Sequence, residues 1–173
     1  APLPPAAAAT ELLRRYLAAY GPSSAGDFAL WAGIAPGQAA RTWQAIEGEL
    51  AAVTVGRKTR RLLSADLPLL TTCALPEGVR LLPPHDSYLA ARDRTSLLPD
   101  KERHAQVWRA AGSPGAVLWN GNLAATWRAQ TKGETLHATV SPWAELPHAA
   151  VEAEFAALAP LRGCRRAAVT WKT

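Results

Sequence analysis

The spacing of the apolar residues changes near residue 73, and this change limits the folds that the chain can adopt. Before residue 73, apolar side chains recur every three or four positions, as on a helix with one buried face. Beyond it, several segments alternate apolar and polar residues, as in a strand with one buried face. The sequence therefore predicts an α+β fold with two domains, over residues 10–72 and 73–173, after an alanine- and proline-rich linker over residues 1–9.

The first domain is expected to contain three helices and a hairpin. The first helix covers residues 10–21, where a Gly-Pro pair stops it. A short second helix is expected over residues 24–33, because Ser24 and Asp27 have the spacing of a capping box. A third helix is expected over residues 36–50, and its exposed face carries small or hydrogen-bonding residues instead of acidic ones.

Two β-compatible stretches follow, and the link between them, residues 56–61, is rich in basic residues. Three helices and a basic-tipped hairpin are typical of a winged helix-turn-helix domain, whose third helix can enter the major groove while the hairpin lies along phosphates. The expected phosphate contacts are Arg57, Lys58, Arg60 and Arg61. Arg41 and Gln44, on the third helix, are candidate base readers. A solvated basic turn and ordinary helix-surface residues would explain the same pattern.

The second domain is expected to be a small mixed β-barrel-like domain. Asn120-Gly121 is a strong hairpin signal, and a second turn at residues 132–133 completes a three-stranded meander. A helix over residues 147–163 and a closing strand over residues 165–171 follow. The tryptophans of this half are expected in its core: Trp119, Trp127, Trp143 and Trp171.

One stretch, residues 80–94, concentrates polar side chains at the end of an expected strand. A proline pair ends that strand, and a short helix capped near Asp86 is expected to follow. The side chains expected to line a ligand-binding rim are Asp86, Tyr88, Arg92 and Arg94. The alternative is structural, with Asp86 only capping the helix and Tyr88 only touching Arg92 one turn away.

The composition narrows the function classes. A net charge of +5 permits a nucleic-acid partner, and no apolar run approaches the ~20 residues of a membrane span. Cys73 and Cys164 lack the spacing of a zinc site, so no metal is expected. Two reduced thiols are favoured, while a disulfide stays open. His85 and Asp86 are adjacent without a serine or cysteine nucleophile motif, which gives an independent hydrolase little support.

Three segments, in this order, resemble one protein family: RYLAAYGPSSAGDFALWAGI, VRLLPPHDSYLAARDR and AVLWNGNLAATWR. They are similar to the winged-helix superfamily of bacterial DNA glycosylases that unhook interstrand crosslinks, the AlkZ/YcaQ-like proteins. The resemblance covers residues 10–171, and its most specific part combines the LLP, D-x-Y-L and RDR elements. His85 departs from the family pattern, in which an aromatic residue is expected at this position.

The resemblance implies tandem winged helices followed by a barrel-like domain, around a basic channel that holds double-stranded DNA. This sequence is similar to the last winged helix and the barrel, which implies that N-terminal winged-helix domains are missing. The family's catalytic motif is Gln, an apolar residue, then Gln or Asp. The glutamines here stand in QAA, QAI, QVW and QTK, so no catalytic residue is assigned.

The expected function is therefore DNA binding by the C-terminal portion of a DNA glycosylase-like repair protein. The resemblance implies a location in the bacterial cytoplasm, associated with the nucleoid, and no cofactor is expected. The alternative is a non-catalytic winged-helix regulator or interaction module.

Overall fold

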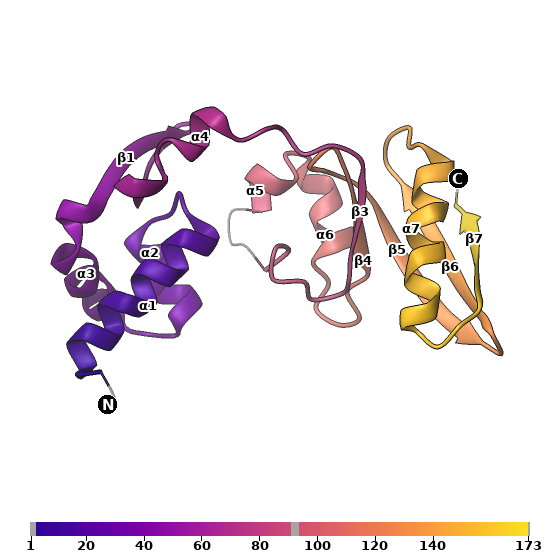
Figure 1. Cartoon of the computed structure of the whole chain (residues 1–173), viewed down its shortest axis with the longest axis horizontal. Coiled ribbons are helices and arrows are strands. Elements are labelled where there is room, and N and C mark those ends of the chain that lie inside the picture. Colours follow the sequence, from indigo (N-terminus) through magenta and orange to yellow (C-terminus); the bar gives the residue numbers. More distant parts are fainter. Residues whose placement is uncertain (1–2, 91–93, 173) are drawn as a thin grey trace. The chain divides into compact units, whose positions relative to one another are not determined.

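The computed structural model describes residues 3–90 and 94–172, and the chain forms two compact units. We call Ala1–Ala74 the N-terminal unit and Leu75–Thr173 the C-terminal unit, and each is described by itself (Figure 1). The described residues form a mixed α+β structure with two sheets, one in each unit.

The first helix of the N-terminal unit, α1 (Pro5–Tyr20), is longer than the sequence predicts. Residues 5–9, expected to be linker, form its first turns. The physical reason is local, because proline suits the first position of a helix and alanine is the best helix former. Leu13 and Leu17 on α1 are buried with Phe28 of α2 (Ala25–Ala32) in the core of this unit.

The caps of α2 confirm the predicted signals. The Ser24 hydroxyl oxygen accepts a hydrogen bond from the Asp27 backbone N–H at 3.2 Å, which satisfies one of the free donors at the helix start. Gly33 ends the helix with φ +67°, a left-handed conformation that glycine adopts without steric cost.

The third helix ends earlier than predicted. α3 (Pro36–Ala45) stops before Ile46, a 3₁₀ turn η1 (Glu47–Glu49) follows, and Leu50 begins strand β1. Ile46 and Leu50 are nonetheless buried. Their four-residue spacing therefore fits a turn into a strand as well as a continued helix, and the apolar pattern could not separate the two.

Strands β1 (Leu50–Val55) and β2 (Lys58–Leu63) pair antiparallel through a turn of two residues, Gly56 and Arg57. The expected link over residues 56–61 is therefore too long, because β2 already begins at Lys58. Gly56 has φ +61°, which such tight hairpin turns require. The unit ends with η2 (Ser64–Asp66) and the short helix α4 (Leu69–Thr72).

The C-terminal unit contains a five-stranded sheet in the order β3-β4-β5-β6-β7. Its neighbours pair antiparallel except β6 and β7, which are parallel and joined by helix α7. The strands and helix are β3 (Val79–Leu82), β4 (Gly115–Trp119), β5 (Asn122–Lys132), β6 (Thr135–Pro142), α7 (His148–Leu161) and β7 (Arg166–Trp171). Asn120 and Gly121 both have positive φ in the β4–β5 turn, which confirms the predicted hairpin.

The described strands form an open sheet and no closed barrel, so the expected α+β architecture holds and the finer expectation of a barrel-like domain is not confirmed. β3 and β7 lie at opposite ends of the strand order, and α7 contacts both of them across one face (Figure 1). Phe155 of α7 is fully buried against Trp127 of β5, and the two rings meet edge to face with their centres 5.4 Å apart. The helix thus covers the apolar face that barrel closure would otherwise bury.

The prediction that the tryptophans lie in the core is confirmed for Trp127, which is 4% exposed. The other three are less buried than predicted. The Trp127 indole N–H donates to the carbonyl oxygens of Leu82 and Ala116 at 3.0 and 3.1 Å. Three further tryptophans are half-buried at the margins of the core: Trp119, Trp143 and Trp171. Cys73 is exposed and Cys164 buried, and both thiols are free.

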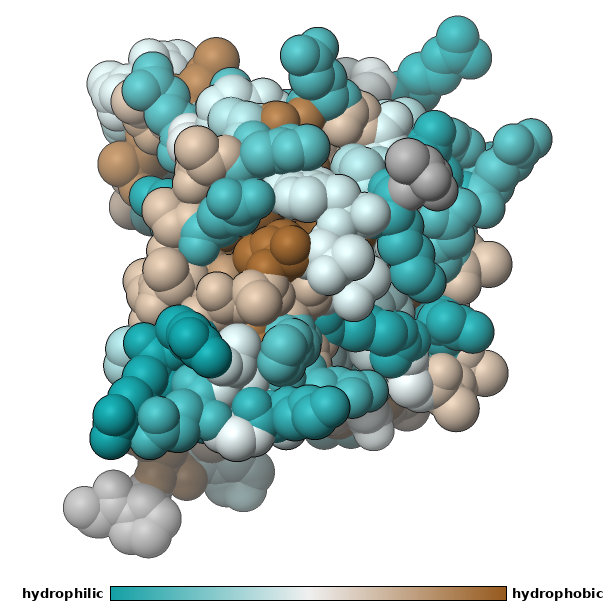
Figure 2. Space-filling view, turned by 90° about the vertical axis from the view of Figure 1, so that its right-hand side faces the viewer, coloured by the Kyte–Doolittle hydropathy of each residue, from teal (hydrophilic) through white to brown (hydrophobic). Residues whose placement is uncertain are grey.

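The second face of the sheet is covered only in part by the described residues. α5 (Arg94–Leu97), η3 (Lys101–Arg103) and α6 (His104–Val107) pack a small cluster against β4 and the start of β5. This cluster contains Leu89, Leu98, Val107, Ala116 and Leu123. Figure 2 views the molecule from the β7 side, where the surface is mainly hydrophilic with a small apolar area near its centre. No described helix is long and apolar enough to span a membrane.

Candidate nucleic-acid interface

The hairpin of the N-terminal unit places two basic side chains at its tip. Arg57 lies in the β1–β2 turn and Lys58 opens β2, and both are exposed. The turn projects beyond the paired strands, so flexible cations there are able to reach a phosphate without displacing core residues.

The other two predicted hairpin contacts, Arg60 and Arg61, lie within β2 and are half-buried. The Arg60 guanidinium is 3.7 Å from the Asp27 carboxylate on α2, and its side chain is 17% exposed. The Arg61 guanidinium is 3.5 Å from the Glu47 carboxylate of η1. Because each has an acidic partner in the fold, these arginines fasten the hairpin to α2 and η1, and the pairing reduces the charge that they themselves offer to a polyanion.

Arg41 and Gln44 are exposed on α3, as the helical spacing predicts. They stand three positions apart and therefore share one helix face. The ten residues of α3 include no acidic side chain. This face is able to approach a polyanion without charge repulsion from its own helix.

The α1 helix is linked to η1 by an ion pair away from the hairpin tip. Arg14 donates two hydrogen bonds of 2.8 Å to the Glu49 carboxylate. These bonds lower the pKa of Glu49 below its ordinary value and raise the pKa of Arg14. The neighbouring Tyr16 hydroxyl is bonded to Ser23 at 2.6 Å, and burial raises the pKa of Tyr16. These groups stabilise the unit.

In the C-terminal unit, residues 87–90 form a turn where the sequence predicts a helix. An Asp86 carboxylate oxygen accepts from the Tyr88 backbone N–H at 2.8 Å, so Asp86 caps this turn. His85, directly after the proline pair, has a left-handed φ of +63°, which a regular helix does not continue. Tyr88 is 43% exposed, while Leu89 next to it is buried. Arg92 lies outside the described residues.

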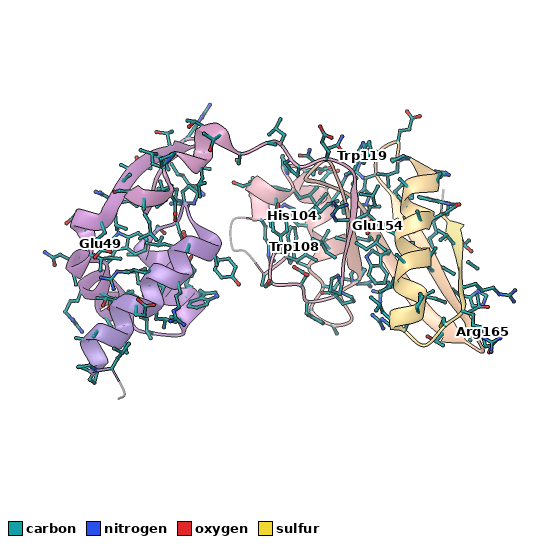
Figure 3. The ribbon with its side chains drawn as sticks, viewed as in Figure 1. Glu49, His104, Trp108, Trp119, Glu154 and Arg165 are labelled. Atoms are coloured by element: carbon teal, nitrogen blue, oxygen red, sulfur yellow. The ribbon has the colours of Figure 1, made fainter. Side chains whose placement is uncertain are left out.

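Arg94 opens α5 and lies over the Trp108 ring, with its guanidinium carbon 5.0 Å from the ring centre. The Trp108 indole N–H donates to the Leu89 carbonyl at 2.7 Å, and the His104 ring meets Trp108 edge-on at 5.1 Å (Figure 3). Leu89 and His104 thus fix the Trp108 indole, and the indole in turn supports Arg94, which is exposed. His85, which adopts a left-handed φ of +63°, lines a 140 Å³ hollow beside Trp108.

The structure also contains a basic groove that the sequence analysis did not identify. It has a volume of about 630 Å³ and lies on the face of β5 and β6 opposite α7. Its cations are Arg109, Arg128 and Lys172, which come from the segment after α6, from β5 and from the residue after β7. The signal was present in the sequence, because every second residue of β5 from 126 to 132 is polar, on the face opposite Trp127 and Ala129.

No described group of three or more His, Cys, Asp or Glu side chains is placed to hold a metal ion. The described surfaces therefore share one chemical character: exposed cations and neutral hydrogen-bonding groups on helices, a hairpin turn and a sheet face. Such surfaces suit contacts to a sugar-phosphate backbone.

Comparison with known proteins agrees with this character. A family model described as "DNA glycosylase AlkZ-like" matches residues 1–161. The structure is similar to that of the Streptomyces sahachiroi DNA glycosylase AlkZ, with a TM-score of 0.84 and 28% sequence identity. The alignment covers 99% of this chain and 48% of that one, so the chain spans about half the length of this relative. A search of curated proteins found no match.

Proposed function

The chain belongs to the AlkZ-like DNA glycosylase family, and from this premise we propose that it is the DNA-binding C-terminal portion of a winged-helix DNA glycosylase-like repair protein. The observation that carries the proposal is the exposed basic tip of the β1–β2 hairpin behind three helices. In a winged helix this hairpin is the wing, and it lies along the DNA backbone. The same arrangement makes α3 the helix that faces the major groove.

The hairpin tip supplies the phosphate contacts of the N-terminal unit in this proposal. Arg57 and Lys58 are exposed there, and Arg60 and Arg61 are half-buried beside Asp27 and Glu47. Arg57 and Lys58 therefore hold phosphates, and the two inner arginines keep the wing aligned with α2 and η1. Phosphate contacts fix a protein on the duplex but carry no sequence information, so binding is weak and tolerant of sequence.

The α3 helix and the stretch after β3 extend the contact. Arg41 and Gln44 approach the edges of bases from α3. In the C-terminal unit, Tyr88 and Arg94 line the rim of the DNA channel, and Asp86 serves the rim by capping the turn that presents Tyr88. Arg92 belongs to the same prediction.

The reaction belongs to the full-length protein in this proposal. There, a water oxygen attacks the anomeric carbon of the sugar while the N-glycosidic bond to the modified base breaks and the base leaves. The four glutamines of this chain do not form the Gln-apolar-Gln or Gln-apolar-Asp motif, so this chain holds the duplex and does not activate the water. Alkylated or crosslinked bases are the substrates that the family resemblance implies.

A titration of labelled duplexes tests the proposal. Two duplexes of unrelated sequence are titrated with the chain at increasing salt, followed by fluorescence anisotropy. We expect similar, modest affinities for both, which fall steadily as salt rises because binding releases counterions. Affinity that ignores salt, or a preference of about 1,000-fold for one sequence, would contradict it, because such discrimination needs base readout. A chain that binds neither duplex would instead favour an interaction module.

A further inference from the structure

We propose that the groove on β5 and β6 of the C-terminal unit binds the phosphodiester backbone of a nucleic acid strand, as a second contact surface besides the hairpin tip. The inference rests on the proposed function, which requires DNA to reach this chain. It concerns a surface that lies wholly within the C-terminal unit, between Ala105 and Lys172.

The sheet presents this surface because its strands alternate strictly. On β5, Trp127 and Ala129 point into the core beneath α7, so Arg128 and Gln130 point to the opposite face. The register pairs Arg128 with Thr139 and Gln130 with His137 on β6. The same face of β4 is covered by the α5–α6 segment, whose end forms one wall of the groove through Gln106 and Arg109. The groove therefore runs between a helical wall and a polar sheet face.

The charge in the groove has one sign. Arg109, Arg128 and Lys172 line it, and its lining includes no Asp or Glu. None of the ion pairs found among the described residues involves these three cations. A cleft lined by unopposed charges of one sign concentrates its field and attracts a polyanion.

The Arg128 guanidinium is held in place before any ligand arrives. Its Nη2 donates a hydrogen bond to the Gly112 carbonyl oxygen in the loop that precedes β4. A guanidinium has five N–H donors, so most of them are still able to bind phosphate oxygens. Fixing the side chain in advance reduces the entropy that binding would otherwise cost.

Further hydrogen-bonding side chains surround the cations. Gln130, His137, Thr139 and Ser141 line the groove from the two strands. On the helical wall, the Gln106 side-chain oxygen accepts a hydrogen bond from the Trp143 indole N–H at 2.8 Å. This contact uses the oxygen of the Gln106 amide and leaves its two N–H donors pointing away from Trp143. A mixture of arginine, lysine, amide and hydroxyl donors is the usual composition of a backbone-binding surface.

The groove favours backbone over bases as its occupant. The tryptophan in its lining, Trp127, is 4% exposed, so its ring offers no surface on which a base could stack. Same-face residues on a strand are about 7 Å apart, so the donors form a row along β5 and β6 instead of a single point. A row of donors suits an extended chain of phosphates better than one free anion.

A set of charge-neutralising variants tests the inference in the full chain. The main variant combines Arg109→Gln, Arg128→Gln and Lys172→Gln. A second, Arg109→Gln with Lys172→Gln, keeps the Arg128 anchor in case its loss disturbs folding. The matched control is Arg162→Gln with Arg165→Gln, at the α7–β7 turn, where both arginines are exposed. Circular dichroism and thermal melting check that each variant is folded.

The readout is the salt dependence of binding to a labelled duplex and to a labelled single strand. Each phosphate contact contributes about 0.9 to the slope of log affinity against log salt on a duplex. The double groove variant should therefore lower that slope by about 1.8 and weaken duplex binding at least ten-fold near 0.1 M salt. The triple variant should lower the slope by about 2.7, while the control changes little.

Three results would overturn the inference. If hairpin-tip variants weaken binding while groove variants behave as the control does, the groove has no role and the proposed function stands. If the unmodified chain binds neither nucleic acid, the proposed function fails and the inference fails with it. If inorganic phosphate saturates the groove residues in NMR spectra while the groove variants bind DNA normally, the surface is a site for small anions.

Discussion

The hairpin tip provides a quantitative prediction. In the variant Arg57→Gln with Lys58→Gln, two exposed cations are lost from the hairpin tip, one in the turn and one at the start of β2, and the strands keep their backbone pairing. Two lost phosphate contacts should lower the slope of log affinity against log salt by about 1.8. At 0.1 M salt the same contacts are worth up to about 60-fold in affinity. Surface substitutions of this kind usually change the free energy of unfolding by less than about 0.5 kcal/mol.

The assay for this prediction is fluorescence anisotropy with one duplex between about 50 and 200 mM salt, a range over which phosphate-driven binding changes strongly. Urea denaturation of the same preparations measures the free energy of unfolding. The matched control is Arg162→Gln with Arg165→Gln, which removes the same charge from an exposed turn where Arg165 pairs with Glu134 at 2.9 Å. Equal losses of affinity in the two variants would refute the reasoning, because net charge alone would then explain the binding.

Three further predictions follow from single contacts. Gly115→Ala should lower the free energy of unfolding, measured by urea denaturation, by about 1–3 kcal/mol, because the new Cβ would lie 2.6 Å from the Leu82 carbonyl oxygen. Arg94→Ala should weaken duplex binding and leave the melting temperature nearly unchanged, since an exposed cation–π contact contributes only about 0.5–1 kcal/mol; the opposite pattern would make Arg94 structural. Hydrogen bonds from Arg14 lower the pKa of Glu49, so the pair stabilises the fold above pH 4.5 and loses that effect as the pH falls through the lowered value. Glu49→Gln should therefore flatten the acid side of a stability-against-pH curve.

Local signals in the sequence predicted much of the fold. Ser24 and Gly33 mark the ends of α2, and Asn120-Gly121 marks the β4–β5 turn, because each acts through its own backbone and nearest neighbours. The end of α3 was not predictable in this way, since Ile46 and the residue four positions later are buried in either conformation.

Features that depend on distant residues were less predictable. An open sheet and a barrel have the same strands, and they differ in whether the outer strands meet, which here depends on how α7 packs across them. Arg60 and Arg61 look like tip residues in the sequence, but Asp27 and Glu47 pair with them only once the helices and hairpin are folded. The groove brings Arg109 together with Arg128 of β5 and with Lys172, which follows β7, and no short sequence motif predicts this grouping.

Mapping the bound duplex onto the chain by NMR tests the central claim most directly. A ¹⁵N-labelled sample of this 18.4 kDa chain is titrated with a short duplex, and the backbone amide shifts are followed residue by residue. The account predicts that the largest shifts fall at the turn of Gly56 and Arg57 and at the start of β2, and that they diminish as salt is added. Shifts confined to the turn around Arg162 and Arg165, or none at a duplex concentration that saturates anisotropy, would contradict it.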